Sequence, residues 1–477
     1  MHIHILGICG TFMGGIAMIA KQAGFTVTGS DKNVYPPMSD ELSNAGIKLH
    51  TGFDAEQLDE KPDLIVVGNV MRRGMDVVER MLNDRCRYVS GPQWLEEHYL
   101  LNKTVLAVAG THGKTTTSSM LTWILEDNGK NPGFLIGGIP ENFGISARST
   151  DSDYFVIEAD EYDCAFFDKR SKFVHYHPTV LIMNNLEYDH ADIFDSVKDI
   201  QKQFHHLVRT VPGKGLVVMP NNDKNLDGVI EMGCWTPVVR IGDENDLNAV
   251  LKSKDGSSFD IYDGKEFICT VNYNCTGTYN VHNALMSIRA AMYTGISIKD
   301  AAKSLETFKL PKRRMELKGI VDDVSVYDDF AHHPTAIKLT TEGLRAKIGQ
   351  DKRLVAVFEP RSNSMKMGAN HEFLAQSFES ADEIFVYANT SVKWDVKSLE
   401  KQCKKPLHVI DDFDKLLTEI VNASPKGTTI LVMSNGGFNG IHQKLLDKLH
   451  DSGSGHRKVE GESDRPDKDR VHLRTYR

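Results

Sequence analysis

The sequence predicts an α/β protein made of three consecutive domains, in which helices pack on mainly parallel sheets. Three observations indicate this fold class. Short apolar runs typical of buried strands recur along the chain, segments with apolar residues at helical spacing alternate with many of them, and two of the runs lead into glycine-rich turns. A chain of 477 residues is long enough for two to four domains with cores of their own.

Charge and cysteine content exclude several classes of protein. A net charge of −9 leaves no strongly basic surface for a nucleic acid. Seven cysteines without a C-x-x-C pair indicate free thiols in a reducing compartment. Residues 1–8 begin a strand rather than a signal peptide, and no apolar run approaches ~18 residues. We therefore expect a cytoplasmic protein that binds neither nucleic acid nor membrane. The sequence leaves the oligomeric state open between a monomer and a weak dimer.

The first predicted domain, residues 1–102, opens with a βαβ unit. A strand at residues 2–6 leads into a glycine-rich turn and a helix, and the next strand ends at Asp31. Such a unit is typical of dinucleotide binding, but these glycines read G-x-x-G-x-x-x-G rather than G-x-G-x-x-G. The turn therefore favours a bound diphosphate over a particular cofactor, and simple packing of the helix on the strand is the alternative.

The second predicted domain, residues 103–315, is organised around Gly110–Thr117, which reads G-T-H-G-K-T-T-T. An apolar strand precedes this turn and a helix follows it, so backbone N–H groups at the helix start would face an anion. Lys114 could reach the outer phosphates of a nucleotide, and the Thr115 hydroxyl could bind Mg²⁺. The full phosphate-loop motif has a further glycine where Val108 stands. A glycine cap before a threonine-rich helix is therefore the alternative.

Acidic residues and a histidine follow the next two predicted strands. Glu158–Asp163 contains four carboxylates in six residues directly after the strand at 154–157, and His190 lies among acids after the strand at 179–183. Ligands gather at the carboxyl ends of the strands in open α/β sheets. We therefore expect a metal site near Lys114, with a solvated acidic turn and a structural histidine as the alternatives.

The rest of the second domain carries less obvious chemistry. Residues 214–275 are predicted to form a meander with strands at 216–219, 238–241, 259–262 and 267–271. A helix then opens near Gly277. Asn280 could be its N-cap, or Asn280 and Asn283 together could bind an adenine edge.

The third predicted domain, residues 316–450, follows a segment that contains Arg313 and Arg314. Strands and helices alternate again, as in a second doubly wound fold. Polar clusters lie at three predicted strand ends, within residues 328–334, 359–364 and 434–437. Residues 451–477 have almost no apolar side chains and are predicted to be a disordered tail.

Six motifs in this order resemble those of the Mur ligase family, whose members join a carboxylate to an amine with ATP. The resemblance covers roughly residues 1–450. It implies an N-terminal Rossmann-like domain for a UDP-sugar, a central P-loop ATPase domain, and a C-terminal Rossmann-like domain that closes on the nucleotide. The motifs are Gly110–Thr117, Glu158–Glu161, Asn184–His190, Tyr279–Ala284, Lys312–Glu316 and Asp328–Thr335.

The resemblance also implies roles for individual residues. The catalytic residues would be Lys114, Glu158 and His190, and Mg²⁺ would be bound by Thr115, Glu158 and His190. ATP would be bound by Gly110, Thr111, His112, Gly113, Lys114, Thr115, Thr116, Asn280, Asn283, Arg314, Asp329 and His332. The UDP-sugar would contact Gly7, Gly10, Thr11, Gly14, Asp31 and Asn69, and a peptide would contact Arg361, Ser362 and Asn363.

Within the family, the N-terminal segment I-L-G-I-C-G-T-F-M-G-G resembles members that use UDP-N-acetylmuramate as the acid. The segments G-N-V-M-R-R-G, F-F-D-K-R-S-K-F and F-E-P-R-S-N-S favour the tripeptide L-alanyl-γ-D-glutamyl-meso-diaminopimelate as the amine, as in cell-wall recycling. Free L-alanine is the alternative amine. The implied reaction proceeds through an acyl phosphate, which the amine then attacks.

Two functions of other classes remain as alternatives. The first glycine turn could belong to a nicotinamide-dependent oxidoreductase, although this leaves Lys114, Glu158 and His190 unexplained. The chain could also be a regulator that binds a nucleotide without turnover.

Overall fold

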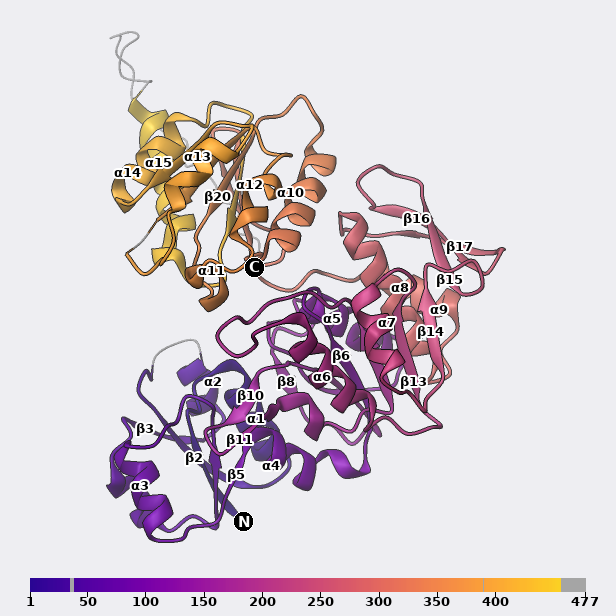
Figure 1. The fold of residues 1–477 in the computed structure, drawn as a ribbon, viewed down its shortest axis with the longest axis vertical. Helices are drawn as coiled ribbons and strands as arrows, with labels where there is room; N and C mark the ends of the chain where they lie inside the picture. The colour runs from indigo at the N-terminus through magenta and orange to yellow at the C-terminus, as the bar shows by residue number, and fades with distance from the viewer. Residues whose placement is uncertain (35–37, 389, 456–477) are drawn as a thin grey trace, which may run out of the picture.

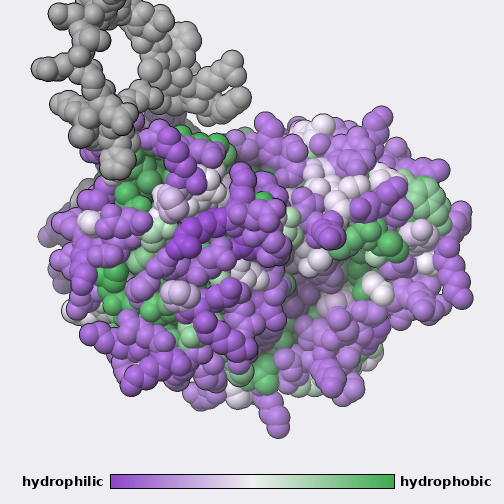
Figure 2. Space-filling model, turned by 90° about the horizontal axis from the view of Figure 1, so that it is seen from above, coloured by the Kyte–Doolittle hydropathy of each residue, from purple (hydrophilic) through white to green (hydrophobic). Residues whose placement is uncertain are grey.

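The computed structural model of the protein describes residues 1–34, 38–388 and 390–455 (Figure 1). Three separate large sheets follow one another along the chain. In Figure 1 the indigo N-terminal part lies at the lower left and the orange to yellow C-terminal part at the top. No helix in the described ranges is both long and apolar enough to cross a membrane. Hydrophilic residues predominate on the face shown in Figure 2, and the hydrophobic ones form several separate patches.

The first sheet has five parallel strands in the order β3-β2-β1-β4-β5. The strand order reverses beside β1, so the turn after β1 faces the crevice in which doubly wound sheets bind ligands. The strands are β1 (His2–Leu6), β2 (Thr26–Asp31), β3 (Lys48–Thr51), β4 (Leu64–Val67) and β5 (Tyr88–Ser90), and the helices are α1 (Thr11–Gln22), α2 (Met38–Asn44), α3 (Asp76–Asn83) and α4 (Gly91–His98).

The second sheet has seven strands in the order β14-β13-β12-β6-β9-β7-β8, and only its edge strand β8 pairs antiparallel. These strands are β6 (Thr104–Ala109), β7 (Gly133–Leu135), β8 (Ala147–Arg148), β9 (Tyr154–Glu158), β12 (Val180–Met183), β13 (Leu216–Pro220) and β14 (Val238–Ile241). The helices that follow in this part of the chain are α5 (Lys114–Asp127), α6 (Val197–Val208), α7 (Lys224–Glu231), α8 (Thr278–Met292) and α9 (Ile298–Leu305).

The predicted meander at 214–275 is wrong in its first half. Strands β13 and β14 are parallel to each other and extend the central sheet, with α7 as the crossover between them. The unbroken apolar sequence of β13 fits a strand buried on both faces. Within residues 214–275, an antiparallel sheet is formed only by β15 (Leu247–Leu251), which was not predicted, β16 (Ser258–Asp263) and β17 (Glu266–Asn272).

The third sheet has six strands in the order β18-β19-β23-β20-β21-β22, all parallel except the edge pair β18–β19. The last helix includes residues 451–455, and the remainder of the predicted tail lies outside the described residues. The strands are β18 (Glu316–Val321), β19 (Val324–Asp329), β20 (Leu354–Phe358), β21 (Glu383–Tyr387), β22 (Leu407–Ile410) and β23 (Thr429–Met433). The helices are α10 (Pro334–Ile348), α11 (Asn363–Met367), α12 (Leu374–Ser377), α13 (Leu399–Gln402), α14 (Phe413–Asn422) and α15 (Ile441–Gly455).

The first two parts of the chain share a continuous apolar core, whereas the third has its own. One buried cluster runs from Ile3 and Ile16 in the first part to Leu135 and Phe155 in the second. A Cβ at Gly15 would lie 2.3 Å from a Leu135 methyl carbon, so the absence of a side chain on α1 permits this close contact. The third sheet is covered by two separate clusters. The first two sheets therefore form one packed body, on which the third part rests.

Candidate active site

Two glycines give the turn before α5 its shape. Gly110 and Gly113 have φ angles of +140° and +77°, which disfavour any side chain. A Cβ at Gly113 would also lie 2.9 Å from Asn283 Oδ1. The turn is anchored to the end of β12, because the His112 N–H donates to Asn185 Oδ1 at 2.8 Å. The free N–H groups at the start of α5 are thereby held in place for an anion.

Lys114 folds back onto its own turn. Its ammonium donates to the Gly110 carbonyl oxygen at 2.7 Å and lies 3.4 Å from Glu161 Oε2. Burial lowers the pKa of Lys114, but the nearby charges of Glu161, Asp160 and Glu158 outweigh it and raise the pKa above its ordinary value. A cation held this way is available for the outer phosphates of a nucleotide.

Thr115 and Glu158 form a pair of oxygen donors beside Lys114. Thr115 Oγ1 lies 3.0 Å from each oxygen of the Glu158 carboxylate, and the Gly137 N–H donates to Oε2 at 2.7 Å. Burial raises the pKa of Glu158, although Lys114 opposes this effect. A divalent cation would offset that cost, and hydroxyl and carboxylate oxygens are suitable ligands for Mg²⁺.

Glu161 connects Lys114 to His190. It is 2% exposed, and its Oε1 lies 2.7 Å from His190 Nε2. Burial lowers the pKa of His190, but the charge and hydrogen bond of Glu161 and the charge of Asp189 raise it to about 9. The ligand atoms of Asp160, Glu161 and His190 all lie within 4.8 Å of one another. Such a group of carboxylates and an imidazole could hold a second cation.

The sequence did not single out Glu161, although it lies in the predicted acidic turn. The structure brings Lys114, Glu158 and His190 to one edge of the central sheet, and Glu161 makes direct contact with two of them. The signal in the sequence was only the density of carboxylates, which does not say which of them points inward.

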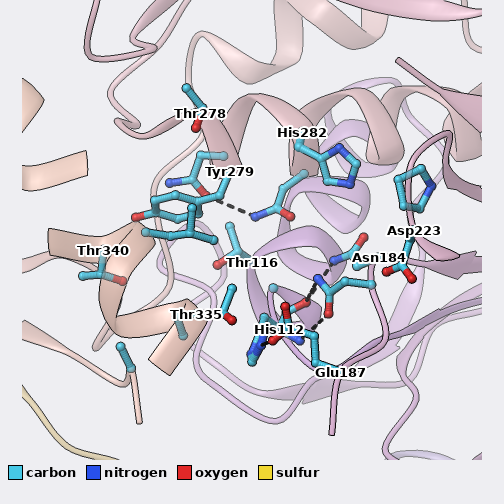
Figure 3. A pocket seen from close by; sticks show the side chains of 18 of the residues that line it. His112, Thr116, Asn184, Glu187, Asp223, Thr278, Tyr279, His282, Thr335 and Thr340 are labelled. Carbon is cyan, nitrogen blue, oxygen red and sulfur yellow. Dashed lines mark hydrogen bonds and ion pairs between the residues drawn. The ribbon is translucent and has the colours of Figure 1, made fainter. Parts of the chain in front are cut away.

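A cavity of about 740 Å³ opens beside the turn, between the central sheet and the third domain (Figure 3). Figure 3 shows Tyr279 and His282 on α8, Thr335 and Thr340 on α10, and His112 and Glu187 below them. The cavity is large enough for a small-molecule ligand. The predicted nucleotide residues that line it are His112, Gly113, Thr116, Asn280, Asn283, Arg314 and Asp329, and its other lining residues include Asn184, Glu187, Asp223, Tyr279, His282, Thr335 and Thr340.

Asn280 is not the N-cap of α8, so that alternative is wrong. The cap is Gly277, and Asn280 lies within the first turn. Its Nδ2 donates to the Thr276 carbonyl at 2.9 Å, while its Oδ1 accepts from Asn283 Nδ2 at 3.2 Å. Both amides are buried and face the cavity, as an adenine site requires.

Three predicted residues approach the site from the third domain and from the segment that leads into it. The Arg314 guanidinium lies over the Phe330 ring and donates to Thr115 Oγ1 at 3.4 Å. Asp329 accepts from the Met315 and Ala331 N–H groups at 2.8 and 2.9 Å, and burial raises its pKa. His332 Nδ1 lies 3.0 Å from the Phe330 carbonyl oxygen. Thr111, in the glycine turn, instead exchanges hydrogen bonds with the backbone of Glu187.

The third domain also holds the loop that carries His190. Ser364 Oγ accepts from the Ala191 N–H at 3.0 Å, and Asn363 Nδ2 donates to Asp192 Oδ2 at 2.9 Å. Of the predicted peptide residues, Asn363 therefore contacts the His190 loop and Ser362 caps α11. The Arg361 side chain is 51% exposed, with Glu359 Oε1 3.8 Å away.

The glycine turn of the first domain combines packing with exposed backbone. A Cβ at Gly14 would lie 2.6 Å from Met38 Sδ and 3.2 Å from the Ile8 carbonyl oxygen, so this glycine permits close packing. Asp31 shapes the turn, because its Oδ2 accepts from the Cys9 N–H at 3.0 Å. Gly10, Thr11 and Asn69 are exposed, and Gly7 has a φ of +80°.

Each of the three parts of the chain matches a domain model of one protein family. The Mur ligase catalytic-domain model matches residues 2–102, the Mur ligase middle-domain model residues 108–291, and the glutamate ligase domain model of the Mur ligases residues 313–436. The UDP-N-acetylmuramate–L-alanyl-γ-D-glutamyl-meso-2,6-diaminoheptandioate ligase of Escherichia coli K12 is 54% identical over 94% of this chain and 98% of its own. The UDP-N-acetylmuramate–L-alanine ligase of Caldanaerobacter subterraneus is 31% identical over 94% of this chain and 97% of its own. The crystal structure of a murein peptide ligase from Psychrobacter arcticus is similar with a TM-score of 0.73 and 47% identity, over 94% of this chain and 99% of that one.

Proposed function

The chain belongs to the Mur ligase family, and we propose that it joins L-alanyl-γ-D-glutamyl-meso-diaminopimelate to UDP-N-acetylmuramate with ATP. The predicted family and the predicted three-domain α/β fold are thereby confirmed. The observation that carries the choice of amine is the 54% identity over nearly the whole chain to a ligase named for this tripeptide, against 31% for one named for L-alanine.

ATP binds in the cavity between α8 and the third domain. Its adenine lies against Asn280 and Asn283, and its phosphates lie over the start of α5. Lys114 exchanges the Gly110 carbonyl for the phosphate oxygens, and Arg314 adds a second positive charge from the segment before the third domain. Asp329, at the edge of the cavity, binds the ribose.

The donor sets beside Lys114 fit magnesium. Thr115 and Glu158 supply oxygens next to the phosphates, and His190, with Asp160 and Glu161, forms a second set within 4.8 Å. Magnesium, when bound, neutralises phosphate and carboxylate charge, which lowers the barrier between two anions. Unit charges ~4 Å apart interact by roughly 4 kcal/mol at the effective dielectric constant of a protein surface, so such neutralisation matters.

The reaction has two steps. The lactyl carboxylate oxygen attacks the γ-phosphorus of ATP, and the bond between that phosphorus and the β-phosphate oxygen breaks. The products of this step are an acyl phosphate and ADP. The amino group of the tripeptide then attacks the acyl carbon, inorganic phosphate departs, and the amine loses a proton. Lys114 stays beside the transferred phosphoryl group, and the third domain excludes water from the acyl phosphate.

The UDP part of the acid lies at the glycine turn after β1, where exposed backbone at Gly10 and Thr11 faces the crevice. Arg361 binds the distal carboxylate of diaminopimelate, because a guanidinium holds a carboxylate through two parallel hydrogen bonds. Two observations support this role. The Arg361 side chain is half exposed, and its ion pair within the described residues, with Glu359, is long at 3.8 Å.

A competition assay tests the proposal. The protein is given ATP, Mg²⁺ and UDP-N-acetylmuramate with equal concentrations of tripeptide and L-alanine, and phosphate release and both products are measured. We expect mainly the tripeptide product. A predominance of the L-alanine product would reject the choice of amine, and no phosphate release with either amine would reject the ligase function.

A further inference from the structure

Lys172 is a buried cation at the junction of the first two domains. It is 9% exposed and follows β11 (Asp168–Ser171) at the start of a short 3-10 helix. Its ammonium lies 4.9 Å from the centre of the Phe12 ring and 3.7 Å from Asp160 Oδ2. Phe12 lies in the first turn of α1, just after the glycine turn, and Asp160 belongs to the group with Glu161 and His190 that could hold a cation. Lys172 therefore lies between the glycine turn of the first domain and the acidic cluster beside Lys114.

Two hydrogen bonds to the backbone of the acidic turn fix this position. The Lys172 N–H donates to the Tyr162 carbonyl at 2.8 Å, and Ser171 Oγ donates to the Glu161 carbonyl at 2.6 Å. The segment that carries Lys172 is therefore attached directly to the acidic turn. Any movement of the acidic turn would carry the ammonium with it.

The Lys172 ammonium is poorly satisfied in the described part of the chain. Its one ion pair there, with Asp160, exceeds hydrogen-bond distance, and no hydrogen bond from it is found within those residues. The ammonium nitrogen is not among the fully buried side-chain atoms that lack a partner in these residues, so a ligand oxygen can still reach it. A partly buried ammonium gains from such a partner. Lys169, three residues earlier, is different: its side chain is 71% exposed and makes an ordinary 2.6 Å pair with Asp163.

We propose that Lys172 binds the lactyl carboxylate of UDP-N-acetylmuramate and positions it for attack on ATP. This inference rests on the proposed function. A UDP-sugar held at the glycine turn must extend its reacting carboxylate past Phe12 toward Lys114 and Glu161, and Lys172 is the buried cation between them. A compact ammonium can bind one carboxylate oxygen while the other faces the γ-phosphate. Asp160, released from Lys172, becomes free to join Glu161 and His190 around a cation.

The test compares two ligands that differ in the carboxylate. UDP-N-acetylmuramate carries the lactyl group, whereas UDP-N-acetylglucosamine has a hydroxyl in its place. Binding of each is measured by calorimetry for the wild type, Lys172→Met and the control Lys169→Met. We expect Lys172→Met to weaken the binding of UDP-N-acetylmuramate roughly 10- to 100-fold, as for loss of a hydrogen bond to a charged group. The affinity for UDP-N-acetylglucosamine should stay within about 2-fold of the wild-type value. Lys169→Met should leave both ligands unchanged.

Two outcomes would overturn the inference: equal weakening of both ligands, which would place Lys172 at the nucleotide, or no change in either. Melting temperature and ATP affinity show whether Lys172→Met is folded, and Lys172→Gln serves as a second variant for the same measurements. Kinetics add an independent readout, because the KM for UDP-N-acetylmuramate should rise in the variant while the KM for ATP stays constant. If the wild type itself neither binds UDP-N-acetylmuramate nor releases phosphate, the proposed function fails rather than the role of Lys172.

Discussion

Substitution of Glu161 by Gln should change the protonation of His190 in the metal-free, nucleotide-free protein. The carboxylate lies 2.7 Å from His190 Nε2 and 3.4 Å from the Lys114 ammonium, and it is almost fully buried. Burial alone would lower the pKa of His190, yet with Glu161 and Asp189 nearby it is raised from 6.5 to about 9. Without the Glu161 charge, we expect the pKa of His190 to fall, because burial and the Lys114 charge lower it and mainly Asp189 still raises it.

The same shift sets a dependence of stability on pH. Because the pKa is higher in the folded than in the unfolded state, protonation of His190 contributes its full stabilisation below pH 6.5. This contribution is lost as the pH rises from 6.5 through about 9. The difference between those two pKa values corresponds to about 3 kcal/mol, at 1.36 kcal/mol per unit. In Glu161→Gln, the free energy of unfolding should lose this pH dependence.

Two measurements check this prediction. Histidine resonances are titrated by NMR in the presence of a chelator, with His190 assigned from a His190→Gln sample, and urea unfolding is followed at several pH values between 6 and 9.5. Glu96→Gln is the matched control, because Glu96 raises the pKa of His177. It should lower that pKa and leave His190 unchanged. A wild-type His190 pKa near 6.5, or no shift in Glu161→Gln, would refute the pairing.

Three further predictions concern catalysis, specificity and packing. Lys114→Ala should abolish phosphate release, while calorimetry should still detect binding of UDP-N-acetylmuramate. Normal turnover by this variant would reject the role of Lys114 in ATP binding. Arg361→Ala should raise the KM for the tripeptide at least 10-fold and leave that for ATP within 2-fold, and equal effects on both would reject the carboxylate clamp. Gly215→Ala should lower the free energy of unfolding, measured in urea, by about 2 kcal/mol, because its Cβ would lie 2.2 Å from the Thr179 carbonyl oxygen. Gly437→Ala is the control and should cost much less, because a Cβ there would have no heavy atom within 4 Å.

The motifs at strand ends could be located from the sequence because their positions follow from local rules. An apolar strand followed by a glycine turn and a helix places Lys114 at the carboxyl end of β6. The same rule placed Glu158 and His190 after neighbouring strands. The identity of the inward-facing acid could not be predicted in this way. Asp160 and Glu161 are adjacent carboxylates, and only the backbone path after β9 decides that Glu161 is the buried one.

Long-range contacts explain the other differences. The membership of β13 and β14 in the central sheet depends on the pairing of β13 with β12 and of β14 with β13, which no local pattern specifies. The contacts of Asn363 and Ser364 with the His190 loop join residues more than 170 positions apart in the chain. Ser362 and Asn363 looked free to bind a ligand because their partners were not visible in the sequence.

The attachment of the His190 loop to the third domain has a consequence for the order of events. His190 has a φ of +55°, an unfavourable conformation for a residue with a side chain, and its neighbours Ala191 and Asp192 are bonded to the third domain. If that domain swings away, the histidine loses the contacts that hold it in this shape. With the third domain swung away, the site for phosphoryl transfer would be incomplete. ATP would then be hydrolysed or transferred only after the domain has closed over the bound substrates.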